Sequence, residues 1–200
     1  MRALMQAIKM TIVLTILLGI VYPLAITGIA NVIFPHQAQG SLIEHNGKVI
    51  GSELIGQTFS SPGYFHGRPS AAGDKGYDAS NSSGSNLGPT NKTFISTVQQ
   101  RLKDILEANP GVDPGRVPID LITASGSGLD PEISPAAADI QVARVAKARG
   151  IGEDDVRLLI EQNTRARQLG VLGEPGVNVL SLNLALDKLS PPKAQAKVEK

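Results

Sequence analysis

Hydroxyl groups and glycines are concentrated between Thr123 and Pro131, where the chain reads Thr-Ala-Ser-Gly-Ser-Gly-Leu-Asp-Pro. We expect a strand before this segment and a helix after it, and in such a setting backbone amides can hold an anion. No lysine or arginine lies nearby in the sequence, so a plain strand-to-helix connection is the favoured interpretation.

A second candidate cluster is the segment Gly63–Ser70, in which two aromatic rings, an imidazole and a guanidinium lie between glycines. The side chains of Tyr64, Phe65, His66 and Arg68 could hold a loop or a carboxylate of a partner chain. A tight turn in which Arg68 pairs locally explains the same residues equally well.

Common catalytic and nucleotide-binding motifs are missing from the sequence. It has no Walker phosphate loop, no G-x-G-x-x-G, no H-E-x-x-H and no G-x-S-x-G elbow. His36, His45 and His66 are not spaced with other ligands as a zinc site requires, and the chain has no cysteine. We therefore expect no catalytic residue, no metal site and no tightly bound cofactor.

The element that must position these clusters relative to a membrane is an uncharged run from Met10 to Phe34. A helix of this length, at about 1.5 Å per residue, crosses the hydrocarbon core. Residues 1–9 carry Arg2, Lys9 and no acid, so the positive-inside rule keeps them in the cytoplasm and places the rest of the chain outside. A cleaved signal peptide is the alternative, but its apolar part is usually shorter than this run.

Small and polar residues recur every four positions along this run and would form one ridge of the helix: Thr11, Thr15, Gly19, Pro23, Thr27 and Asn31. Such residues allow another transmembrane helix to approach closely. Pro23 also frees a backbone carbonyl that a neighbouring helix could satisfy. We name these six residues the small-residue ridge and predict that it packs against a partner span.

The remainder of the chain is nearly neutral. All 18 acidic residues lie at Glu44 or later, together with 17 of the 19 basic residues. The sequence has no stripe of basic residues that would indicate nucleic acid as a partner. Three tyrosines, four phenylalanines and no tryptophan predict a modest core in one domain. The stretch from Gly51 to Gly88 is rich in glycine, serine, proline and asparagine, and is a candidate contact surface.

Local patterns predict a small α+β domain over residues 35–190, followed by a flexible tail over 191–200. Asn46-Gly47 predicts a hairpin within 41–50. A helix is expected from Phe94, capped at Thr90 or Asn91, and a buried strand over 117–123.

Two more helices and a last strand follow in this prediction. One helix starts at the cap residue Ser134 and runs to Arg149; the next starts at Glu153 and carries Arg165 and Arg167 at its end. Alternating leucines from Leu180 to Leu186 predict a strand, although a helix over 177–189 also fits their spacing.

Several sequence blocks, in this order, resemble the C subunit of the Kdp-type potassium-transporting ATPases over nearly the whole chain. The blocks are Gly-Ile-Val-Tyr-Pro-Leu ending at Leu24, then residues 37–42, 51–57, 64–70, 84–88, 117–130, 141–149 and 177–187. The resemblance is weak over 100–116 and after Leu189.

This resemblance implies a non-catalytic accessory subunit of an ATP-driven potassium uptake pump in the bacterial plasma membrane, needed for assembly and activity. Its partners would be an ATP-hydrolysing subunit and a potassium-channel-like subunit. The resemblance also implies a catalytic chaperone that raises the ATP affinity of the hydrolysing subunit, which suggests ATP as a ligand. The residues associated with nucleotide in this way are Ser125, Gly126, Ser127, Gly128 and Gln141.

The charge argument and this implied role conflict, because an external domain meets little ATP. We give topology priority and expect the domain to lie over the external entrance of the potassium subunit. The alternative function is a membrane-tethered, exported binding module for a small ligand or an envelope component; an enzyme ranks third.

Overall fold

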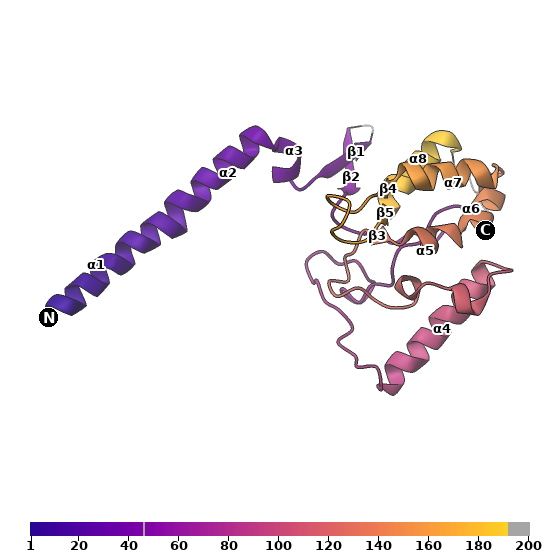
Figure 1. Cartoon of the computed structure of the whole chain (residues 1–200), viewed down its shortest axis with the longest axis horizontal. Coiled ribbons are helices and arrows are strands. Elements are labelled where there is room, and N and C mark those ends of the chain that lie inside the picture. Colours follow the sequence, from indigo (N-terminus) through magenta and orange to yellow (C-terminus); the bar gives the residue numbers. More distant parts are fainter. Residues whose placement is uncertain (46, 192–200) are drawn as a thin grey trace, which may run out of the picture. The chain divides into compact units, whose positions relative to one another are not determined.

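The computed structural model describes residues 1–45 and 47–191 (Figure 1). Its contacts divide the chain after Ser52 into an N-terminal unit, residues 1–52, and a main unit that begins at Glu53. The predicted fold class is confirmed: one N-terminal apolar helix precedes a small region of mixed helices and strands. The predicted tail lies outside the described residues, apart from Pro191.

The N-terminal unit begins with a single long helix in three parts, α1 (Arg2–Ile16), a π-helical segment η1 (Leu17–Val21) and α2 (Tyr22–Ile33). It is long and apolar enough to cross a membrane, with 32 residues and a mean hydropathy of 2.4 over its most apolar 18-residue stretch. The wider π turn comes just before Pro23, whose ring would crowd the backbone one turn earlier in a regular helix. The helix begins at Arg2, before the uncharged run that starts at Met10, and it ends at Ile33, one residue before Phe34.

A short helix and a hairpin complete the N-terminal unit. Helix α3 (Pro35–Ala38) leads to strand β1 (Leu42–His45), which pairs antiparallel with β2 (Lys48–Ser52). Gly47 has a φ of 73°, a conformation that glycine adopts without strain. The predicted hairpin is thus confirmed, and Asn46 in its turn lies outside the described residues.

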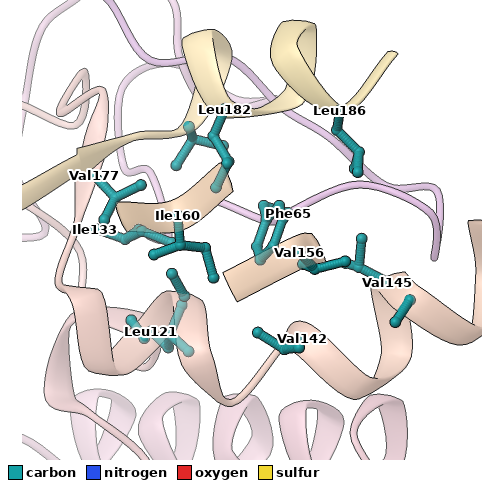
Figure 2. Close-up of a cluster of buried hydrophobic side chains, with 14 residues drawn as sticks. Phe65, Leu121, Ile133, Val142, Val145, Val156, Ile160, Val177, Leu182 and Leu186 are labelled. Carbon is teal, nitrogen blue, oxygen red and sulfur yellow. The ribbon is translucent and has the colours of Figure 1, made fainter. Parts of the chain in front are cut away.

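The main unit is built around a three-stranded antiparallel sheet in the order β3 (Glu132–Ile133), β5 (Gly176–Asn178), β4 (Thr164–Arg165). Its helices are α4 (Lys92–Ala108), α5 (Pro135–Asp139), α6 (Val142–Arg149), α7 (Glu153–Gln162) and α8 (Val179–Leu189). Figure 2 shows the core, in which the Phe65 ring lies among side chains from α6, α7 and α8. Phe65, Val142, Val145, Val156 and Leu182 are fully buried.

Helix α4 follows the sequence pattern. The side chain of Asn91 accepts hydrogen bonds from the backbone amides of Thr93 and Phe94, which confirms the predicted cap. None of the α4 residues is buried, although the partly buried Ile105 packs against the core.

The predicted strand over 117–123 is wrong. The chain instead forms two short 3₁₀ turns, η2 (Pro114–Arg116) and η3 (Ile119–Leu121), on either side of Pro118. The hydroxyl of Thr123 donates to the carbonyl of Ile119, a local bond that competes with strand pairing. The helix cap at Ser134 comes soon after, and Asp120 accepts from both the Ser134 amide and its hydroxyl.

The predicted single helix from Ser134 to Arg149 is two helices. Ser134 caps α5 as expected, and Gly150, with a φ of 72°, ends α6. Between them the Gln141 amide donates to the carbonyl of Ala138, only three residues back, and this tighter turn interrupts the helix.

The predictions for the end of the helix that starts at Glu153 and for the strand over 180–186 are also corrected. Helix α7 ends at Gln162, so Arg165 lies in β4 and Arg167 just after that strand, rather than at a helix end. The leucines from 180 to 186 lie in helix α8, not in a strand, because Asn178 caps a helix by accepting from the Ser181 amide. Their helical spacing buries Leu182 and Leu186 on one face.

Candidate functional site

The segment around Phe65 is bound to α8 through its backbone. The Phe65 amide donates to Asn183 Oδ1 at 2.8 Å, and Asn183 Nδ2 donates to the Phe65 carbonyl at 3.0 Å. Asn183 is buried, so its amide group completes these backbone groups in the way a neighbouring strand would. The Phe65 ring is part of the core, which leaves it no surface for the partner contact that the sequence suggested.

Gln141 holds the next residue, His66, by the same pairing. The His66 amide donates to Gln141 Oε1 at 2.8 Å, and Gln141 Nε2 donates to the carbonyls of His66 and Ala137 at 3.2 and 3.0 Å. Arg144 Nη2 also donates to Oε1, at 2.6 Å. A glutamine amide has two donor hydrogens and two acceptor positions, and here all four are used inside the chain.

Arg144 links α6 to two separate segments. Its guanidinium donates to the carbonyls of Pro62 and Tyr64 and to Asn109 Oδ1, besides Gln141. These acceptors are neutral, and burial lowers the pKa of Arg144 to about 10. Burial and the nearby Arg144 charge also lower the pKa of His66, whose Nε2 lies 3.1 Å from the Ser61 carbonyl. The His66 imidazole therefore favours the neutral form in this structure.

Tyr64, Arg149 and Asp187 form one cluster at the other end of α6. The Arg149 guanidinium lies 4.5 Å from the centre of the Tyr64 ring and 2.7 Å from Asp187 Oδ1. The Tyr64 hydroxyl donates to Asp187 Oδ2 at 3.0 Å, and burial together with this contact raises the Tyr64 pKa. Tyr64 is therefore held by its own chain on both its ring face and its hydroxyl.

Arg68 has its carboxylate partner within the chain. Its Nη1 donates to Asp130 Oδ2 at 3.0 Å, and the Arg68 carbonyl accepts from the Tyr77 hydroxyl. Burial raises the pKa of Tyr77 to about 12. The sequence left open whether Arg68 binds a partner or pairs locally, and the structure gives a third arrangement, a pair between residues far apart in the sequence.

The hydroxyl-rich segment 125–128 packs against residues 70–84. Gly128 has a φ of 67°, and a side chain there would collide with the Ser83 carbonyl and the backbone of Ala72, whereas Gly126 faces open space. Ser125 is buried, and its hydroxyl has no hydrogen-bond partner in the part of the chain described. Ser127 accepts from the Leu129 amide.

The residues associated with nucleotide by resemblance therefore separate into two groups. The hydrogen bonds of 125–128 go to Ser70, Ser82 and Leu129, whereas those of Gln141 go to other residues. No hydrogen bond among the described residues joins the segment to Gln141. The described residues also contain no group of three or more histidines, aspartates and glutamates that could hold a metal ion.

The small-residue ridge lies exposed along the N-terminal helix. A side chain added at Gly19 would meet only the Thr15 methyl, at 4.0 Å, and the Asn31 amide donates to the Thr27 carbonyl at 2.8 Å. Among the described residues all six members of the ridge are exposed, so packing against a partner span stays a prediction.

Reasoning from the sequence did not single out four residues that organise the main unit: Arg144, Arg149, Asn183 and Asp187. One signal was available for Arg149, since it falls seven and four residues after Val142 and Val145 and so shares their buried face. A charged residue on an apolar face needs a buried partner. The identity of that partner, 38 positions further on, has no signal in a single sequence.

Comparisons with known proteins agree on one family. The family model described as KdpC, the K+-transporting ATPase c chain, matches residues 4–188. A potassium-transporting ATPase KdpC subunit from Gemmatimonas aurantiaca is 58% identical over 190 residues, which is 95% of this chain and 94% of that protein. The KdpC subunit from Koribacter versatilis is 53% identical over 95% of this chain and 96% of that protein. The KdpC subunit from Rhodospirillum rubrum is 56% identical over 96% of this chain and 98% of that protein.

Proposed function

Because the chain belongs to the KdpC family, the accessory c chains of K+-transporting ATPases, we propose that it supports the pump from outside the cell without binding nucleotide itself. In this proposal its partners are the ATP-hydrolysing subunit and the potassium-channel-like subunit of one complex in the bacterial plasma membrane. The N-terminal helix anchors the chain among their spans, and the main unit lies over the external entrance for potassium.

The orientation is supported by charge. Arg2 and Lys9 are the only charged residues before Glu44, and they lie at the start of a helix long enough to span. The positive-inside rule keeps such a start in the cytoplasm. The main unit then faces a compartment with little ATP.

One observation carries the rest of the proposal: the Gln141 side chain has no free hydrogen-bonding position. Its oxygen accepts from the His66 amide and from Arg144, and its nitrogen donates to the carbonyls of His66 and Ala137. Contact with a nucleotide would break at least one of these bonds in a buried place, which is costly. If the subunit raises the ATP affinity of the hydrolysing chain, we propose that it does so through contacts between subunits.

The test has two measurements. A small tag fused after Lys200 should be labelled by a membrane-impermeant reagent in spheroplasts without permeabilisation, and a tag before Met1 should be labelled only after it. The full chain in nanodiscs should bind no magnesium ATP at concentrations up to millimolar. Labelling of the C-terminal tag only after permeabilisation would overturn the orientation, and saturable ATP binding that Gln141→Ala abolishes would overturn the indirect role.

A further inference from the structure

The turn formed by residues 168–172 carries three large aliphatic side chains into solvent. Leu169, Val171 and Leu172 are 89%, 72% and 55% exposed. They belong to the uncharged sequence Gln-Leu-Gly-Val-Leu-Gly, which projects from the sheet between β4 and β5. The hydrophobic effect opposes such a cluster in water, and contiguous exposed apolar groups usually mark a contact surface.

Most backbone amides of this turn are hydrogen-bonded within it or to the residue just before it. Gln168 and Leu172 exchange two hydrogen bonds of 2.9 Å, the Val171 amide donates to the Gln168 carbonyl, and the Gly170 amide donates to Arg167. Four amides of the turn are therefore satisfied without water. Pairing of this kind lowers the cost of entering a low-dielectric surrounding, while the Leu169 amide and the carbonyls of Leu169, Gly170 and Val171 have no backbone partner among the described residues.

Leu169 occupies an unusual conformation, with a φ of 52° followed by 77° at Gly170. Two consecutive positive φ values form a tight turn in which asparagine or glycine is the usual first residue. A leucine there is strained, and the strained residue is the most exposed of the three. The conformation thus directs an apolar side chain outward at a position where a polar residue would fit more easily.

The composition of the turn favours lipid over a protein partner. Leucine and valine are under-represented at the energetic centres of protein interfaces, where tryptophan, tyrosine and arginine dominate. At the base of the turn Arg165 pairs with Glu132 and Arg167 with Glu174, each at 2.6 Å, so the charges there are balanced. Attraction to a membrane would then rest on apolar burial rather than on anionic lipid.

A bilayer is within reach of this turn on either side of the membrane. Residues 34–52 join the apolar helix to the main unit, and because they include α3 and the paired strands β1 and β2, they span much less than the about 65 Å of a fully extended chain of that length. A domain of this size has a radius of gyration of about 15 Å, so a short join of this kind keeps the main unit near the bilayer that holds the helix. The tether keeps the effective concentration of that surface high.

We propose that the 168–172 turn inserts its three aliphatic side chains into the boundary between the headgroups and acyl chains of the bilayer, as a second membrane contact of this chain. The turn enters as a preformed element because four of its backbone amides are already paired. Contact with the interface follows the rule for monotopic segments, in which buried apolar area sets the strength of binding.

The chain has no tryptophan, so one introduced indole reports on its own surroundings. The full-length variants Leu169→Trp and Val171→Trp are placed in nanodiscs of zwitterionic lipid, with lipid brominated on the acyl chains as the quencher. The matched control is Ile119→Trp, at a position 71% exposed in another part of the main unit. We expect blue-shifted emission and loss of intensity to bromine at both positions of the turn, but red emission quenched by aqueous iodide at Ile119.

Each of the following three outcomes would overturn the proposal. Iodide quenching without bromine quenching at Leu169 would show the turn in water. Emission that becomes blue-shifted only in the assembled pump, without bromine quenching, would assign the turn to a protein partner. A bromine effect that requires anionic lipid would contradict insertion driven by apolar burial. The readout does not depend on the side of the membrane, so it is independent of the proposed orientation.

Discussion

Arg149 and Asp187 form an ion pair of 2.7 Å that joins the end of α6 to α8, and the Tyr64 ring covers the guanidinium. The Arg149 side chain is 2% exposed and that of Asp187 is 32% exposed. Arg149 also donates to the carbonyls of Gly63 and Ser190. Three segments of the main unit thus meet at one buried cation.

Asp187→Asn should destabilise the chain by about 3 kcal/mol, the low end of the range for breaking a buried ion pair, because Asp187 keeps partial access to water. The measurement is chemical denaturation followed by circular dichroism. The control is Glu174→Gln, which removes an exposed pair with Arg167 and should cost less than about 1 kcal/mol. Equal losses in the free energy of unfolding of the two variants would show that Arg149 does not need the negative charge of Asp187.

Gln141→Ala should cost about 2 to 4 kcal/mol, because both backbone groups of the partly buried His66 lose their partners. Ser125→Ala removes a buried hydroxyl that has no partner among the described residues, so stability should stay equal or rise slightly. Both are measured as free energies of unfolding. The Ser125→Ala subunit in the assembled pump should also leave the KM for ATP unchanged, and a large rise in that KM at unchanged stability would contradict the indirect role.

Stability should fall as the pH decreases below about 6.5, the ordinary His66 pKa. Burial lowers the pKa of folded His66, so the unfolded chain takes up the proton first, and the stability present above 6.5 is lost as the pH falls through the lower folded value. His66→Gln should flatten this dependence in denaturation curves measured between pH 7.5 and 5. His45→Gln, at an exposed position of β1, should retain it, and a wild-type slope in His66→Gln would assign the effect elsewhere.

Gly19→Leu should weaken co-purification with the other pump subunits while leaving the chain in the membrane fraction. Within the chain the added side chain meets only Thr15, so a loss would report on a partner helix. Gly28→Leu is the matched control, since it lies in the same helix, off the small-residue ridge and with open space around it. If both variants keep their partners in mild detergent, the ridge is not the packing surface.

Much of the fold could be predicted from local patterns. The apolar helix, the hairpin at Gly47, the cap of α4 at Asn91 and the stop at Gly150 each depend on residues within a few positions of one another. Caps, turns and hydrophobic runs act at that range, so a single sequence records them directly.

The errors arose where a local pattern fitted two structures. The leucines of 180–186 satisfy both alternation and helical spacing, and the cap at Asn178 selected the helix. The helix predicted from Ser134 to Arg149 broke near Gln141, whose side chain completes the backbone of His66.

The amino-acid sequence by itself determined the apolar helix, the charge difference between its two ends and the family. The tertiary structure alone decided which polar side chains form their hydrogen bonds and ion pairs within the fold. Gln141 and Asn183 bind the backbone of residues 65–66, and Arg149 pairs with Asp187. The physical reason is range, because capping and hydrophobic spacing act over a few residues, whereas the partner of a buried polar group is whichever atom folding brings within 3 Å.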